Sequence, residues 1–126
     1  MESTIARGAP WTALVLEDEF IIAFDLEERL TAVGASEVRL ASAAKEAARL
    51  IVDWRPTIAL VDWRLADGTS DRFVQSLLTA GICVALVSGS FRSEIPIADQ
   101  SRLRFLQKPV LDSDLAAAVG GLLDAI

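Results

Sequence analysis

Acidic side chains, one hydroxyl and one lysine follow short apolar runs at well-separated points of this 126-residue chain. Glu17 and Asp18 follow TALVL, Asp62 follows TIALV, Ser88 follows ICVALV, and Lys108 comes shortly after LRFL. Each run has the length and composition of a strand, and most read as buried on both faces. If the strands are parallel, all five side chains lie beyond the carboxyl ends of one sheet, where such sheets place their working sites.

Carboxylates gathered in this way repel one another. Two of them about 4 Å apart repel by about 4 kcal/mol at an effective dielectric constant near 20, so the cluster requires a compensating cation. Mg²⁺ is suited to it, because this ion binds one or two carboxylates together with waters and a phosphate. Lys108 offers a second positive charge to a phosphoryl oxygen. Since an aspartate can be the nucleophile in phosphoryl transfer, the residues predict Mg²⁺-dependent transfer to Asp62.

The elements that position these residues alternate along the chain. Ser42 and Ser70 are expected to cap helices, and Gly34 to end one. The segment 91–101 contains Pro96 and little periodicity, so any helix there is short. Five strands separated by helices predict an α/β, doubly wound (βα)5 fold. We expect strands at 12–16, 37–41, 57–61, 82–87 and 103–106, and helices at 20–33, 43–54, 71–80 and about 112–125.

Four segments resemble those of response regulator receiver domains of two-component systems. They are LVLEDE (14–19), ALVDWRLADG (59–68), ALVSG (85–89) and FLQKP (105–109). The resemblance covers residues 11–126 and leaves residues 1–10 as an N-terminal extension. It implies a flavodoxin-like fold with a five-stranded parallel sheet in the order 2-1-3-4-5. Pro96 and the short interval from Ser88 to Lys108 predict a short or irregular fourth helix. Shortened fourth helices and receivers with no output domain both occur in this family, so we expect an apparently stand-alone receiver.

The resemblance also assigns a metal site and an acceptor. In this family an acidic pair after the first strand holds Mg²⁺, which implies Glu17 and Asp18. The phosphoacceptor after the third strand corresponds to Asp62, which also binds the metal. The backbone carbonyl two residues further on, that of Arg64, completes the implied protein ligands.

Three further residues have implied roles around the phosphoryl group. Ser88 and Lys108 correspond to the residues that contact it. Phe105 corresponds to the switch aromatic, which acts together with Ser88. The chain departs from the family pattern at Ala66, where a proline is usual, at Ser88, where threonine is commoner, and in the short interval from Ser88 to Lys108.

The implied function is that of a signalling domain rather than an enzyme, catalysing only its own phosphorylation and dephosphorylation. Because the chain has no histidine, the phosphoryl group would come from a partner histidine kinase or phosphotransfer protein, and a switched face would bind a downstream protein. A pseudo-receiver that binds proteins without phosphorylation is the alternative. A phosphatase with an aspartyl nucleophile is weakly supported, because Trp63-Arg64 follows Asp62 in place of a D-x-D pattern.

Composition excludes several other classes. The net charge of −6 and the pI near 4.6 disfavour binding to nucleic acid or to anionic membranes. A single cysteine, Cys83, forms no internal disulfide, and no apolar stretch is long enough for a membrane span. A cytoplasmic location is therefore the expectation. Phe20, Ile21 and Phe24 form a second apolar stripe on the first helix, so a weak homodimer stays open beside the ordinary exposure of apolar residues.

Overall fold

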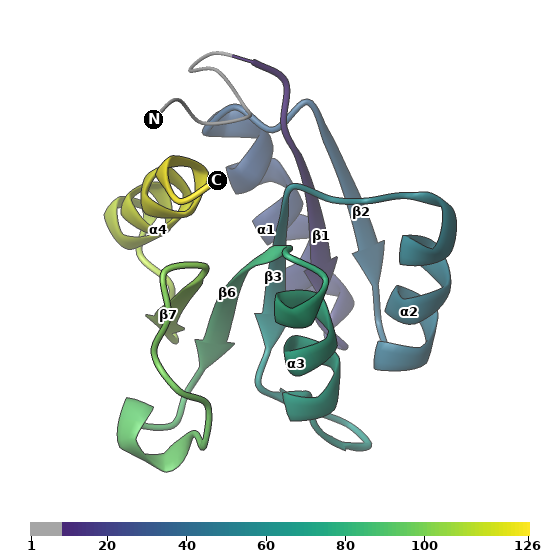
Figure 1. Ribbon diagram of the computed structural model, residues 1–126, viewed down its shortest axis with the longest axis vertical. Helices are drawn as coiled ribbons and strands as arrows, with labels where there is room; N and C mark the ends of the chain where they lie inside the picture. The colour runs from purple at the N-terminus through teal and green to yellow at the C-terminus, as the bar shows by residue number, and fades with distance from the viewer. Residues whose placement is uncertain (1–8) are drawn as a thin grey trace.

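The computed structural model describes residues 9–126 and contains a five-stranded parallel sheet between two layers of helices (Figure 1). The sheet order is β2-β1-β3-β6-β7, which confirms the predicted order 2-1-3-4-5. Residues 1–8 of the predicted N-terminal extension lie outside the described residues. The strands are β1 (Thr12–Leu16), β2 (Glu37–Ala41), β3 (Ile58–Asp62), β6 (Cys83–Ser88) and β7 (Leu103–Gln107).

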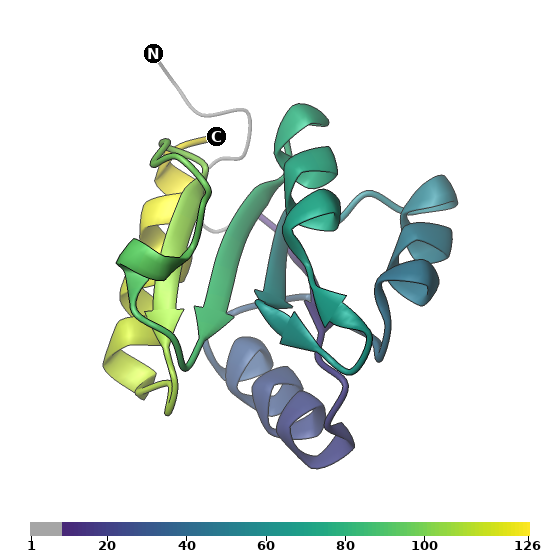
Figure 2. The same ribbon diagram turned by 90° about the horizontal axis from the view of Figure 1, so that it is seen from below.

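Two helices cover each face of the sheet, as the view in Figure 2 shows. Helices α1 (Phe20–Ala32) and α4 (Asp112–Asp124) share one face, and α2 (Ala44–Asp53) and α3 (Asp71–Thr79) share the other. Each face holds its own hydrophobic cluster, because successive side chains of a strand point to opposite sides. None of the helices among the described residues has the length and apolar character needed to span a membrane.

The three central strands are buried along almost their whole length, which explains their uninterrupted apolar sequences. In β1, Leu14 packs into the cluster beneath α2 and α3, while Val15 packs into the cluster beneath α1 and α4. Both side chains are fully buried. A strand that is covered on both faces has no polar side to show, so its sequence does not alternate. The charged residues are therefore displaced to the strand ends.

The segment after β3 differs from the loop that the sequence predicts. It contains a two-stranded antiparallel hairpin, β4 (Arg64–Leu65) with β5 (Gly68–Thr69). Gly68 has a φ of +130°, a conformation that L-residues with a side chain rarely adopt. Asp67-Gly68 thus marks a real turn, but the paired segments on either side are too short to be recognised from alternation.

The segment between β6 and β7 has a single 3₁₀ turn, η1 (Arg92–Glu94), which agrees with the expected short or irregular fourth helix. The Arg92 guanidinium donates to the carbonyls of Ile95 and Ile97 and to the carboxylate of Asp99. Its carbon also lies 3.7 Å from the ring centroid of Phe105 on β7. One arginine therefore satisfies carbonyls that a regular helix would pair internally, and it ties the segment to β7.

Candidate functional site

The acidic side chains of the strand ends lie together. One oxygen from each of Glu17, Asp18 and Asp62 lies within 4.8 Å of the others. Glu17 follows β1 directly, and its N–H donates to Ala41 O at the end of β2, so the neighbouring strand fixes its backbone. Asp62 is the last residue of β3. Because these strands are parallel neighbours, their carboxyl ends share one edge of the sheet.

Lys108 lies next to the two buried carboxylates of the cluster. Its Nζ lies 3.0 Å from Asp62 Oδ2 and 3.6 Å from Glu17 Oε1. The Lys108 N–H donates to Ser88 O at 2.9 Å, which places the lysine just beyond the β6–β7 ladder. Burial alone would lower the pKa of Lys108, but the hydrogen bond and negative charge of Asp62, together with Glu17, raise it above its usual value. The lysine is therefore positively charged at neutral pH.

Glu17 is the strained member of the cluster. Its side chain is 3% exposed, and burial raises the pKa of Glu17 to about 7, with the Asp62 charge and Asp18 adding to the shift. The Glu19 N–H, 3.1 Å from Glu17 Oε2, and the Lys108 ammonium partly oppose it. One ammonium does not balance three carboxylates. The donors are all oxygens, and Asp18 is exposed while its two partners are buried, so the set suits a hard divalent cation.

The remaining predicted residues lie around this cluster. Ser88 ends β6 and is buried, and its Oγ accepts from the Ser90 N–H at 2.8 Å, which leaves the hydroxyl proton free to donate elsewhere. Arg64 begins β4 and is exposed. Phe105 is half-buried and packs against the cluster beneath α2 and α3.

Comparison with known proteins rests on structure alone. Neither the family models nor the curated proteins match the chain. Among solved structures, the receiver domain of PhyR from Erythrobacter litoralis has a TM-score of 0.78 at 20% identity, covering 90% of both chains. A CheY-like receiver domain from Methylobacillus flagellatus has a TM-score of 0.76 at 19% identity, covering 90% of this chain and 98% of the other. The chain has the fold of a response regulator receiver domain.

The anti-anti-sigma factor PhyR from Bartonella quintana has the same fold in part of its chain. It has a TM-score of 0.78 at 24% identity, and the match covers 90% of this chain but only 47% of that one. The chain thus spans about half the length of that protein. What the two share is the receiver fold. In this chain the acidic cluster lies at the carboxyl ends of the strands of that fold.

Sequence reasoning missed one buried residue of this receiver fold's site. Ser70, which is 2% exposed, was expected to cap the third helix, yet its side chain makes no cap hydrogen bond. Its Oγ instead donates to the backbone carbonyl of Asp62 at 2.7 Å, and its N–H donates to Trp63 O at 2.9 Å. The serine folds the hairpin segment back onto the end of β3. Ser70 lies eight residues after Asp62, and no local sequence pattern predicts a hydrogen bond across that separation.

Proposed function

We propose that this chain is a phosphorylatable receiver domain that accepts a phosphoryl group on Asp62 in a Mg²⁺-dependent reaction. The observation that carries the proposal is the position of Asp62. Its carboxylate lies within the three-carboxylate cluster and 3.0 Å from the Lys108 ammonium. On a receiver fold this arrangement supports a role for Asp62 as the nucleophile, because the carboxylate lies between a candidate metal site and a positive charge.

The metal would be held by oxygen atoms of four residues. We assign Asp18, Asp62 and the Arg64 carbonyl as direct ligands, with Glu17 acting through water. Mg²⁺, when bound, would neutralise charge on the phosphoryl oxygens and on the carboxylates around it. The raised pKa of Glu17 fits this assignment. Burial is its main cause and the charge of Asp62 adds to it, so a cation bound nearby would stabilise the ionised form of Glu17.

The transfer itself requires positioning more than covalent help from the protein. A carboxylate oxygen of Asp62 bonds to phosphorus as the bond from phosphorus to the donor's histidine nitrogen breaks. The electron pair of that bond stays on the nitrogen, and the imidazole takes a proton from solvent and leaves as the neutral ring. Lys108 lies close enough to Asp62 to hold a phosphoryl oxygen by its charge. The Ser88 hydroxyl has a free proton to donate to a second oxygen.

The donor would be a partner histidine kinase or phosphotransfer protein, because the chain contains no histidine. The output would be a change of the face around Phe105 that a downstream protein recognises. Ser88 would turn toward the phosphoryl group, and Phe105 would follow into the space nearby. Such a role makes the chain a signalling domain whose only chemistry is its own phosphorylation and dephosphorylation.

The test is labelling with acetyl phosphate and Mg²⁺, read by intact-protein mass spectrometry. We expect one phosphoryl group on the wild type and none on Asp62→Asn. Asp67→Asn is the matched control, because Asp67 is an exposed aspartate in the same connection between β3 and α3, and it should label as the wild type does. Labelling that survives Asp62→Asn would identify another acceptor. No labelling of any variant would favour the pseudo-receiver alternative, a protein-binding module without phosphorylation.

A further inference from the structure

Strand β7 ends the sheet, and its outer side is open. Among the residues that the structure describes, it pairs only with β6. Val84 N–H donates to Arg102 O and Lys108 N–H donates to Ser88 O, so the even-numbered residues of this stretch point their backbone groups toward β6. Leu103, Phe105 and Gln107 therefore point theirs outward, and we call these three residues the β7 edge.

Within the described part of the chain, only the first residue of the β7 edge has hydrogen-bond partners on its outer side. Leu103 N–H donates to Gln100 O at 3.1 Å, and Leu103 O accepts from Arg104 at 3.1 Å. Over residues 9–126, no hydrogen bond from outside the ladder reaches the backbone of Phe105 or Gln107. Unpaired backbone groups at an edge are a template for another strand.

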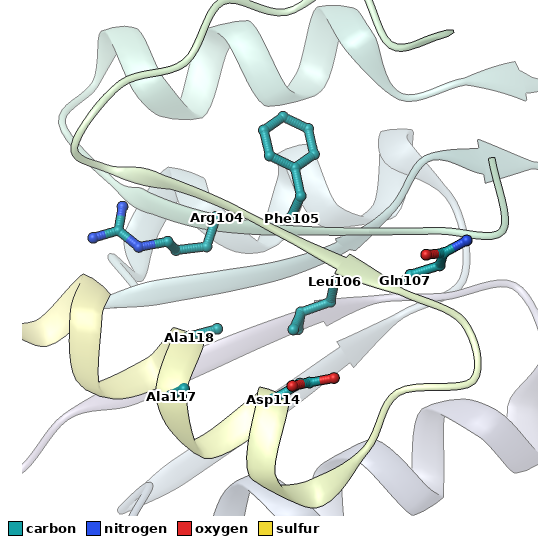
Figure 3. A pocket seen from close by; sticks show the side chains of 7 residues that line it. All are labelled: Arg104, Phe105, Leu106, Gln107, Asp114, Ala117 and Ala118. Carbon is teal, nitrogen blue, oxygen red and sulfur yellow. The ribbon is translucent and has the colours of Figure 1, made fainter. Parts of the chain in front are cut away.

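Two hollows flank this edge, one on each face of the sheet. The first, of about 300 Å³, lies between β7 and α4 and is seen in Figure 3. The second, of about 170 Å³, lies on the side of Arg92 and Ile95. Both are lined by the same stretch of β7, Phe105 to Gln107. A strand added beside β7 would send successive side chains to opposite faces, and thus into both hollows.

We infer that the added strand is β7 of a second copy of this chain, paired antiparallel about a two-fold axis at Phe105. In this register Phe105 faces its own counterpart, and the two residues exchange both of their outward hydrogen bonds. The two rings lie side by side on the Arg92 face, as an aromatic cross-strand pair. Gln107 then faces Leu103 of the copy, and its N–H can donate to the Leu103 carbonyl. The inference does not depend on phosphorylation of Asp62.

Charge complementarity selects a second copy over another extended segment. In the same register Arg104 of one copy lies opposite Leu106 of the other. Figure 3 shows Arg104 at one end of the hollow beneath β7 and Asp114 on α4 at the other, with Leu106 between them. Asp114 is exposed and makes no ion pair with any residue in the range 9–126. The two-fold axis brings each Arg104 to the Asp114 of its partner, which gives two reciprocal pairs.

Room for the partner comes from the small side chains on α4. Ala117 and Ala118 line the hollow, and Figure 3 shows both on the helix surface below β7. The helix contacts β6 and β3 as well as β7, so it sits inward from the open edge. The long side chain of a partner's Arg104 can therefore lie along the hollow without displacing the helix.

Sedimentation velocity from low-micromolar to near-millimolar concentration tests the inference. We expect the wild type, of 13.6 kDa, to approach twice its mass as concentration rises. Arg104→Asp and Asp114→Arg should each weaken dimerisation about tenfold or more, because each breaks both pairs and sets like charges together. The double variant should recover most of the wild-type affinity, since it restores both pairs in reversed polarity.

Two further measurements separate the β7 edge from other contacts. Ile21→Glu, placed on the exposed apolar stripe of α1, should leave dimerisation unchanged. The amides of Phe105 and Gln107 should exchange hydrogen more slowly as protein concentration rises. Because Arg104 also holds the Ser101 and Leu103 carbonyls, Asp114→Arg is the decisive single variant. A monomer at every concentration, or a dimer lost in Ile21→Glu but kept in Asp114→Arg, overturns the inference.

Discussion

Glu17 makes the stability of this protein depend on pH in a direction unusual for a carboxylate. Burial raises the pKa of Glu17 from 4.5 to about 7 in the folded protein. The folded state therefore holds the proton more tightly than the unfolded state. The contribution of Glu17 to stability is fully present below pH 4.5 and is lost as the pH rises through about 7.

The size of this change in stability follows from the difference between the pKa values of Glu17 in the unfolded and folded states. A difference between 4.5 and about 7 corresponds to about 3 kcal/mol, at about 1.4 kcal/mol for each unit of pKa. In metal-free buffer we expect the free energy of unfolding to be lower at about pH 8 than at about pH 5 by an amount of this order. The absence of histidine removes the side chains that ordinarily titrate in this window.

Urea unfolding with a chelator present, followed by circular dichroism, measures this difference. Glu17→Gln removes the titrating group, so its free energy of unfolding should change much less between the two pH values. Glu19→Gln is the matched control, because Glu19 is an exposed neighbour, and it should behave as the wild type does. Added Mg²⁺ should stabilise the wild type more at the higher pH. Parallel curves for the wild type and Glu17→Gln would refute the reasoning.

Three more predictions concern residues around the site. Ser70→Ala should lower stability by about 1 kcal/mol, because it leaves the buried Asp62 carbonyl unpaired, and it should slow labelling by acetyl phosphate; unchanged melting and labelling would count against a positioning role. Mg²⁺ should change the fluorescence of Trp63, which adjoins Asp62, and Asp18→Asn should weaken that response, whereas an identical titration would remove Asp18 from the ligand set. Arg92→Leu should speed proteolysis of the segment 91–101, because it removes the side chain that holds three partners there; protection equal to the wild type would contradict this.

The sequence by itself determined the architecture. Continuous apolar runs such as TIALV need cover on both faces, and this need forces helices onto both sides of a parallel sheet. Right-handed crossovers then leave few possible strand orders, and the resemblance to receiver domains selects the observed one. A polar residue at the carboxyl end of a buried strand must lie at the edge of the sheet, where it is close to the corresponding residues of the neighbouring parallel strands. Glu17, Asp62 and Lys108 were therefore brought together by strand pairing alone, with separations that reach 91 residues.

Only the tertiary structure decided how these residues are held and how they are charged. Ser70 bonds the Asp62 carbonyl because the β4–β5 hairpin folds back, and a hairpin of two residue pairs has no periodicity to read. Arg92 holds the segment after β6 in place of a regular helix, by donating to the carbonyls of Ile95 and Ile97. Because every residue has a backbone carbonyl, no sequence pattern identifies the ones that a side chain will bind. The pKa of Glu17 depends on its burial beside Asp62. Such contacts are set by the packing of distant segments, so they carry no signal in the local order of the amino acids.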